Sequence, residues 1–205
     1  MSSVKIEGNA SGTGIFTIAS PNSNTNRTLT LPDNTGTIVT TGSSTAITQS
    51  MIGTGVAGTG PAFSAYRATS AQTVTNATLT KLQAQTEEFD TASCYDNATN
   101  YRFTPNVAGY YQVNGNIYLQ ATTALADVNF ITIYKNGARS KDGTAFYGGG
   151  AVGKYVFAQV STIIYLNGST DYIELYGYVN GTGTLTFESS TGAWSYFQAF
   201  LARAA

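Results

Sequence analysis

YRFTPNVAGYYQVNGNIYL, residues 101–119, contains the clearest strand signal in the chain. From position 110 onward the chain alternates strictly between two sets of residues. The odd set is Tyr111, Val113, Gly115, Ile117 and Leu119, and the even set is Tyr110, Gln112, Asn114, Asn116 and Tyr118. A period of two indicates a strand with one buried face. Pro105 lacks a donor N–H and Gly109 permits a turn, so the chain should break just before this strand.

Further strand patterns follow on both sides of this stretch. They cover residues 62–67, 78–83, 128–134, 155–166, 172–179, 185–187 and 194–201. The pairs Asn136-Gly137, Asn167-Gly168 and Asn180-Gly181 tolerate positive φ, so they favour tight turns between strands. Many short strands with turn signals and no helical period predict an all-β sandwich over residues 61–205.

The first 60 residues have a different composition. They contain 35 Gly, Ser, Thr or Asn residues and a single aromatic residue, Phe16. Such a segment buries too little apolar surface to order itself alone. Short strand-like runs nevertheless recur, and their apolar residues are Ile15, Phe16, Ile18, Leu29, Leu31, Ile38 and Val39. We therefore expect a β-rich stalk or attachment segment over 1–49, shared among three chains, with a flexible Gly/Ser/Thr linker as the alternative.

The glycine-rich run Ser50–Pro61 separates this segment from the sandwich. Glycine lets backbones approach closely, so we expect residues 50–60 to form a narrow neck. The expected organisation is an attachment segment at 1–49, a neck at 50–60 and a head domain at 61–205.

The composition excludes several classes of function. Only 10% of residues are charged and the net charge is −1, so we expect no nucleic-acid partner and no anionic membrane partner. Histidine is absent and Cys94 is the only cysteine, which rules out an intrachain disulfide, a Cys/His zinc site and a triad with a histidine base. The N-terminus has no apolar signal core and no run of about 18 apolar residues occurs, which predicts a soluble chain without a secretion signal or membrane insertion.

Neither catalysis nor a cofactor is predicted. Carboxylates are present, but nothing in the sequence places two of them across a cleft, as a glycosidase requires. Calcium remains possible because Asp96, Asn97 and Asp171 offer hard oxygen ligands, yet no spaced Asp/Asn/Gly loop occurs and turn chemistry explains these residues equally well.

Two strands place aromatic residues on the face opposite their core side. These residues are Tyr172, Tyr176 and Tyr178 on one strand and Trp194, Tyr196 and Phe200 on the last strand. A monomer rarely exposes so much apolar area in one patch. We therefore expect these six residues to form the interface of a homotrimer.

The segment Tyr134–Gly150, YKNGARSKDGTAFYGGG, is the most exposed-looking candidate for contact with a partner. It combines charged groups with aromatic platforms that suit a sugar or protein surface, at Lys135, Arg139, Lys141, Asp142, Phe146 and Tyr147. A solvated hairpin is the competing interpretation. Three copies on one trimer would strengthen weak contacts through avidity.

The spacing of Phe103, Gly109 and Tyr111 resembles the signature of the jelly-roll family that includes the globular heads of complement component one q and is related to tumour necrosis factor. Phe89, Asp96 and Tyr101 fall roughly where that signature has a Phe, an Asn or Asp, and an aromatic residue, although the spacing from the aromatic residue to Phe103 is shorter here. At Val113 and Gly115 the aromatics usual in the family are missing. The resemblance implies a ten-strand-type jelly-roll head and a compact trimer.

Two stretches resemble proteins of bacteriophage particles more specifically. FTPNVAGYYQVNG is similar to the version of this signature found in tail fibres, and NRTLTLPDNTGTIVTTG is similar to a stretch that recurs in tail-fibre stalks and attachment regions. This resemblance implies a virion protein attached to other virion proteins through its N-terminal segment. Two roles stay open: a tail fibre or spike that recognises a host-surface glycan or protein, and a trimeric capsid decoration (cement) protein.

Overall fold

The structure is a computed structural model of the chain, and it describes residues 11–15, 17, 19, 22–26, 28, 60–147, 153–190 and 194–205. The chain divides into two units, Met1–Ile52 and Gly53–Ala205, and each is described by itself.

The described residues of the first unit contain a turn and bends but no strand. The backbone N–H of Thr25 donates a hydrogen bond of 3.1 Å to Ser23 Oγ. Ile15, which belongs to the first expected strand run, lies in no strand and is 93% exposed. The other apolar residues of the expected runs lie outside the described residues, as does most of the expected neck. They are Phe16, Ile18, Leu29, Leu31, Ile38 and Val39.

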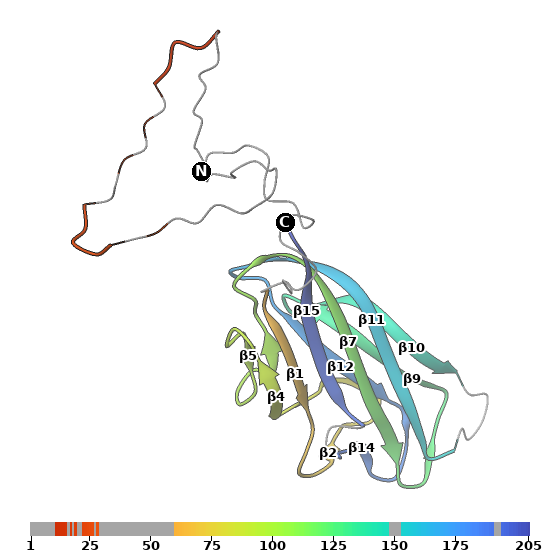
Figure 1. Cartoon of the computed structure of the whole chain (residues 1–205). Helices are drawn as coiled ribbons and strands as arrows, with labels where there is room; N and C mark the ends of the chain where they lie inside the picture. The colour runs from red at the N-terminus through yellow and green to blue at the C-terminus, as the bar shows by residue number, and fades with distance from the viewer. Residues whose placement is uncertain are drawn as a thin grey trace, which may run out of the picture. The chain divides into compact units, whose positions relative to one another are not determined.

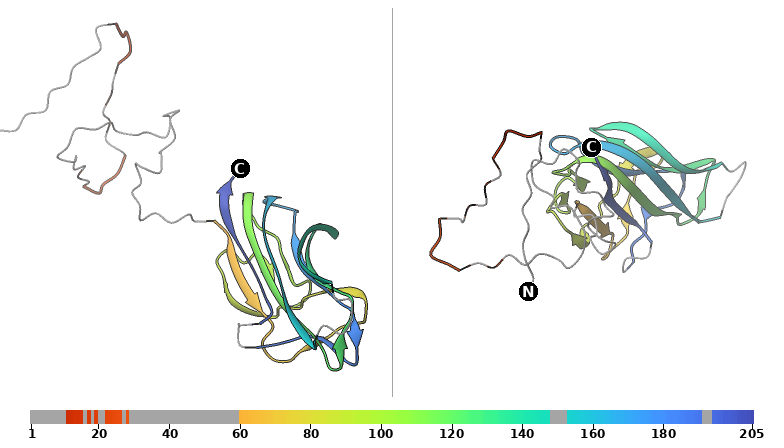
Figure 2. Two further views of the ribbon diagram at one scale, coloured as in Figure 1. Left: turned by 90° about the vertical axis from the view of Figure 1, so that its right-hand side faces the viewer. Right: turned by 45° about the horizontal axis from the view of Figure 1, so that its top comes forward.

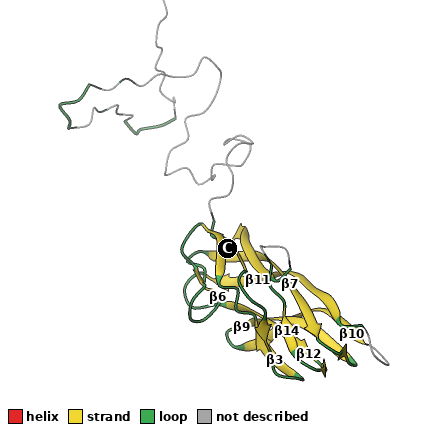
Figure 3. Ribbon diagram, turned by 90° about the horizontal axis from the view of Figure 1, so that it is seen from below, coloured by secondary structure: helices red, strands yellow, loops and turns green. Residues whose placement is uncertain are grey.

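The second unit is a sandwich of two antiparallel sheets, and its described residues contain no helix (Figures 1 and 3). The first sheet contains β1 (Ala62–Tyr66), β2 (Gln72–Thr73), β4 (Thr86–Asp90), β7 (Ala108–Ala121), β11 (Tyr155–Asn167), β14 (Leu185–Phe187) and β15 (Tyr196–Ala204). The second contains β3 (Thr78–Lys81), β5 (Tyr95–Asp96), β6 (Arg102–Phe103), β9 (Val128–Lys135), β10 (Ala138–Tyr147) and β12 (Ile173–Val179). A short ribbon pairs β8 (Ala124–Leu125) with β13 (Gly181–Thr182).

The chain passes repeatedly from one sheet to the other. The first sheet has the order β2-β14-β7-β15-β1-β4, with β11 on the free edge of β7, and the second has the order β10-β9-β12-β6-β5, with β3 beside β12. Because β7 is long, it pairs with β11 along one edge and with both β15 and β14 along the other. Figure 2 shows the resulting two layers of strands. The architecture is an all-β jelly roll, which confirms the predicted fold class.

The core lies between the sheets and includes a cluster of aromatic rings. Phe63 stacks on Tyr95 and Phe103 with ring centroids 4.5 Å and 4.6 Å apart, and its edge contact with Phe197 measures 5.1 Å. All four side chains are buried. Offset-stacked and edge-to-face pairs add to the stability gained from burial alone. The cluster joins β1 and β15 of the first sheet to β5 and β6 of the second.

The predicted alternation of β7 and β11 is confirmed along both strands. Every odd position from Tyr111 to Leu119 is buried on β7, and Val156, Ala158, Val160, Ile164 and Leu166 are buried on β11. β7 starts at Ala108, two residues before its expected start at Tyr110. Gly109 lies inside β7, where an added Cβ would sit 2.5 Å from the carbonyl oxygen of Arg203. Gly109 therefore serves close packing against β15 and not a turn.

The turn predictions are confirmed in part. Asn136 and Gly137 have φ values of 53° and 77°, as a tight hairpin between β9 and β10 requires, and Gly168 has a φ of 71°. The Asn180-Gly181 prediction is wrong, because Gly181 begins β13 and pairs with Leu125. The chain instead bends at Gly183, whose φ is 85°. The last strand begins at Tyr196, two residues after its expected start.

Candidate interaction surfaces

The outer face of the first sheet carries most of the exposed large hydrophobic side chains of the head. Along β7 and β11 these side chains alternate with the buried ones, as the strand period requires. They are Tyr110, Tyr155, Phe157, Ile163, Tyr165, Trp194 and Phe200. Such a concentration on one face marks an interaction surface.

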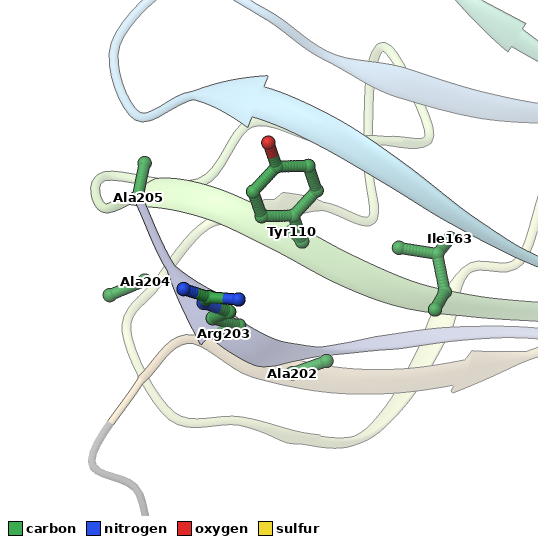
Figure 4. Close-up of a pocket in the computed structure, with 6 residues that line it drawn as sticks. All are labelled: Tyr110, Ile163, Ala202, Arg203, Ala204 and Ala205. Atoms are coloured by element: carbon green, nitrogen blue, oxygen red, sulfur yellow. The ribbon is translucent and has the colours of Figure 1, made fainter.

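Two apolar clusters lie at opposite ends of this face. The first consists of Tyr110, Ile163, Tyr165 and Phe200, and the Tyr110 and Tyr165 rings are 5.5 Å apart. Tyr110 and Ile163 line a pocket together with the C-terminal residues 202–205 (Figure 4).

The second apolar cluster consists of Tyr118, Tyr155, Phe157 and Trp194. The Tyr118 ring lies at its centre, 4.6 Å from Phe157, 5.0 Å from Trp194 and 5.5 Å from Tyr155. Burial among these rings raises the pKa of the Tyr118 hydroxyl. The cluster joins three segments that are far apart in the sequence.

A band of uncharged polar side chains, which we call the polar belt, separates the two clusters. Strand register places its members side by side across the sheet. They are Ser161, Asn114, Gln198 and Ser64 in one row and Gln159 and Asn116 in the next. A pocket over this band is lined in part by Asn114, Gln159, Ser161 and Gln198.

The two sheets differ in charge. Four strands of the first sheet, β1, β7, β11 and β15, contain a single charged residue, Arg203, and the edge strand β4 adds Glu87, Glu88 and Asp90. The strands of the second sheet contain eight. Charged side chains resist burial unless they are paired. The first sheet is thus the face that another protein surface can cover with little desolvation cost.

The outer face of the second sheet is more polar, and its aromatic rings stack on one another. Tyr134 stacks on Tyr176 at 4.1 Å and Phe130 on Tyr178 at 5.0 Å. Burial, followed by the nearby Glu174 carboxylate, raises the pKa of Tyr176 to about 12. Glu174 is itself buried and accepts a charged hydrogen bond of 2.6 Å from Lys81. Tyr172, just before β12, and Tyr176 and Tyr178 within it are each partly buried.

The six expected interface residues therefore do not share one surface. Trp194, Tyr196 and Phe200 belong to the outer face of the first sheet. Tyr176 and Tyr178 lie on the outer face of the second sheet, on the opposite side of the sandwich. Tyr172 precedes them in the chain, and the centre of its ring lies 4.4 Å from the Arg102 guanidinium. Alternation shows which side of a strand faces outward, but it does not show to which sheet the strand belongs. A single contact patch cannot contain both groups.

Most of the aromatic residues on the outer face of the first sheet were not predicted from the sequence as interface residues, although most of them are exposed. They are Tyr110, Tyr118, Tyr155, Phe157 and Tyr165, together with the aliphatic Ile163. A usable signal was present, because on β11 these residues occupy the positions opposite the correctly identified core side.

The expected partner-contact segment is a hairpin of β9 and β10, and its triple glycine lies outside the described residues. Alternation is weak in β10 because bulges interrupt its pairing at two places, so the sequence looked like a loop. Lys135 is held by Asp171 at 2.8 Å and by the Tyr165 carbonyl, and Phe146 packs against the core. The side chains of Lys141 and Tyr147 are left free to meet a partner.

Arg139 and Asp142 form a bidentate ion pair with distances of 2.7 Å and 2.9 Å. The Arg139 guanidinium also lies 4.6 Å from the centre of the Phe130 ring. The hydrogen bonds with Arg139 lower the pKa of Asp142. The pair is exposed and preorganised, so it offers a partner a fixed arrangement of donors and acceptors.

The carboxylates of Asp96 and Asp171, which were considered as calcium ligands, already accept hydrogen bonds within the protein. Asp171 accepts hydrogen bonds from Lys135, Asn136 and Asn167, and these contacts, led by Lys135, lower the pKa of its carboxyl. Asp96 accepts four hydrogen bonds from residues 98–100. Among the described residues, no group of three or more Asp, Glu, Cys or His side chains is placed to hold a metal ion.

The Asp96 turn leads to a prediction on acid stability. Its hydrogen bonds, led by that from the Thr99 N–H, lower the pKa of the carboxyl to about 2 from 3.8. The stability that they contribute is present above pH 4 and is lost as the pH falls toward 2. We expect Asp96→Asn to lower the free energy of unfolding by ~1–2 kcal/mol at pH 7, after allowance for solvent screening, and to change little at pH 2.

Thermal unfolding at the two pH values measures this difference. Asp127→Asn, at an exposed position, is the matched control and should leave the unfolding temperature unchanged. An equal loss of stability for Asp96→Asn at both pH values would contradict the assignment of the effect to the ionised carboxylate.

Comparisons with known proteins support the fold. No family model and no curated protein match the chain. Among solved structures, the chain is similar to Eiger, a tumour necrosis factor of S. frugiperda, with a TM-score of 0.53 and 12% identity over 71% of this chain and 95% of that one. Two structures of murine APRIL have TM-scores of 0.47 and 0.49 at 8% identity, over 69% of this chain and 98% of theirs. At such identity the Eiger similarity shows that the head has a tumour-necrosis-factor-like jelly-roll fold, and no more than the fold.

Within the described part of the chain, no helix has the length and apolarity needed to span a membrane.

Proposed function

We propose that the protein is a self-assembling structural protein of a bacteriophage particle, a trimeric tail fibre or spike whose jelly-roll heads are displayed for recognition of the host surface. The observation that supports self-assembly is the outer face of the first sheet, which has two apolar clusters and few charged side chains. A second copy of this chain fits such a face, because a neutral surface meets its own copy without repulsion between like charges.

Closed assemblies of identical chains with threefold symmetry have heterologous contacts, in which two different patches meet. The face of β7 and β15 offers one patch, and the exposed edge strand β11, with Tyr155, Phe157 and Tyr165, offers the other. This arrangement covers both apolar clusters in every copy. It leaves the charged second sheet directed away from the neighbouring copies.

Recognition of the host surface is then the role of the second sheet and its β9–β10 hairpin. The hairpin presents the Arg139–Asp142 pair, Lys141 and the exposed Tyr147 on the charged side of the head. Tyrosine and arginine are frequent at the energetic centres of protein interfaces. Three hairpins on one trimer bind a repetitive host glycan or protein by avidity. No catalytic step is part of this proposal.

The placement in a virion rests on the sequence resemblance of residues 26–42 and 103–115 to phage tail-fibre proteins. A trimeric capsid decoration protein is the second candidate, because the same N-terminal segment would serve to clasp a capsid lattice. In that role the N-terminal segment binds other virion proteins and the heads need no specific ligand.

Antibody labelling of purified particles tests the virion assignment. An antibody raised against the head is applied to particles released from cells that produce the protein, and the label is located by electron microscopy. We expect label at the tail. Label over the whole capsid would replace the fibre role by decoration, and particles without label would overturn the virion assignment.

A further inference from the structure

The polar belt divides an otherwise apolar face at its centre, where an interface usually places its most apolar side chains. We propose that this belt fixes the number and the register of the copies that assemble through the first sheet. The inference rests on the assembly proposed above and adds to it the residues that make the assembly specific.

The centre of the belt is held rigidly by its own hydrogen bonds. Asn114 Oδ1 accepts hydrogen bonds from Ser161 Oγ at 2.9 Å and from Gln112 Nε2 at 3.1 Å. Gln112 Nε2 also lies 3.0 Å from Ser161 Oγ. Three side chains on two neighbouring strands thus hold one another in a fixed arrangement, so the belt presents its remaining polar atoms in defined positions.

A single chain does not satisfy all hydrogen-bonding groups of the belt. Asn116 donates through its amide nitrogen to the Trp194 carbonyl, and its Oδ1 is the one buried side-chain oxygen in the described residues that has no hydrogen-bond donor. Because Asn116 is only 2% exposed, this oxygen is covered within the chain and does not pair across an interface.

Gln159, opposite Asn116 on the edge strand β11, has an exposed side chain. The amide oxygen of Gln198 lies 3.5 Å from Ser64 Oγ, whose proton is donated to Glu88 at 2.6 Å. The amide groups of Gln159 and Gln198 can therefore pair across an interface.

Burial of such groups makes an interface selective. Burial of a polar atom without a partner costs free energy, so each misplaced amide weakens a wrong arrangement of copies. Tyr118, Phe157 and the other residues of the two apolar clusters pack adequately in several registers, because dispersion and burial are not directional. Only an arrangement that pairs the belt of one copy with polar groups of the next avoids this cost. Buried polar residues set register and copy number in this way in coiled coils.

Charge supports a second copy as the occupant of this surface. The side chains of the belt are amides and hydroxyls, which act both as donors and as acceptors, so the surface is complementary to itself. The carboxylate that borders the belt, Glu88 of β4, already accepts a hydrogen bond of 2.6 Å from Ser64 Oγ. The belt is also continuous with the two apolar clusters on either side, which makes it part of the same contact.

Native mass spectrometry of the full chain tests the proposal with two leucine variants. We expect wild type to give one species of three copies. Asn114→Leu removes the acceptor at the centre of the belt, and we expect it to keep associating but to spread over several copy numbers, with at least about a third of the protein outside the trimer peak. Ser140→Leu adds the same side chain at an exposed position of β10 and should keep the single trimer peak.

The possible results separate the two proposals. If Asn114→Leu and Gln159→Leu are both as uniformly trimeric as wild type, the role of the belt is overturned and the assembly stays intact. Monomeric wild type would overturn the assembly itself. Because Asn114→Leu also breaks hydrogen bonds within the chain, Gln159→Leu is the second variant, since that side chain is exposed on the edge strand and outside the core. Mixed copy numbers for Gln159→Leu support the belt, and a uniform trimer for both variants rejects it.

Discussion

Replacement of Phe157 by aspartate is expected to convert the assembled protein into folded monomers. Phe157 stacks on Tyr118 in the second apolar cluster, and 45% of its surface is exposed in a single chain. In the assembly an aspartate at this position would place an unpaired carboxylate in an apolar contact, which costs several kcal/mol. We expect the dissociation constant of the trimer to rise by at least ~100-fold, equivalent to roughly 3 kcal/mol. Sedimentation velocity at micromolar concentration measures the change.

Tyr147→Asp is the matched control for this experiment. Tyr147 is even more exposed, at 79%, but it lies on β10 of the charged second sheet. The same aromatic-to-aspartate change should leave the sedimentation coefficient at the wild-type value. Dissociation caused by Tyr147→Asp but not by Phe157→Asp would place the interface on the second sheet and contradict our assignment.

Truncation of Phe63 to alanine is expected to have the largest effect on the stability of the head. Its ring contacts Tyr95, Phe103 and Phe197, and it is 1% exposed, so alanine leaves a cavity that β strands from both sheets cannot easily fill. Losses of about 3–5 kcal/mol are typical for such a change. Because small domains are stable by only about 5–15 kcal/mol, we expect a large fall in the denaturant midpoint.

Chemical denaturation followed by tryptophan fluorescence measures this loss, since Trp194 is the only tryptophan. Phe63→Leu should lose markedly less, because it leaves a smaller void, and Tyr147→Ala should be nearly neutral. A Phe63→Ala midpoint within experimental error of wild type would mean that the aromatic cluster is not the centre of the core.

The strands of the head could be predicted wherever one face is buried and the other is wet. In β7 and β11 nearly every second residue is apolar or glycine, with Thr162 the exception on β11, and the buried apolar residues were identified correctly. Asn136-Gly137 was recognised as a turn because few other pairs adopt positive φ at both positions. These features depend on the local sequence alone, which explains the success.

Features that depend on distant residues could not be predicted. β10 follows no simple alternation, since its bulges and the contact of Gly143 with the backbone of β11 are set by neighbouring strands. The assignment of Tyr176 and Phe200 to opposite faces depends on the topology of the jelly roll, which joins β12 to one sheet and β15 to the other. Lys135 and Phe146 looked free in the sequence, whereas Asp171 and the core engage them in the fold.

The strands that are poor in charged residues can be read from the sequence, but only the fold shows that they lie side by side in one sheet. The segments of β1, β7, β11 and β15 are separated by up to 134 residues, as in the contact between Ser64 and Gln198. Each segment alone is merely poor in charge. Once the topology brings them together, they form one face with a single charged residue, Arg203, which is the main structural reason for proposing an assembly of identical chains.

The molecular mass of the full chain in solution is the most direct test of the central claim that this protein assembles through the outer face of its first sheet. Sedimentation equilibrium is the suitable method, because it depends on mass and not on shape. We predict a single species of about 64 kDa, three times the 21.5 kDa of the chain. A stable species of 21.5 kDa at micromolar concentration would contradict the claim.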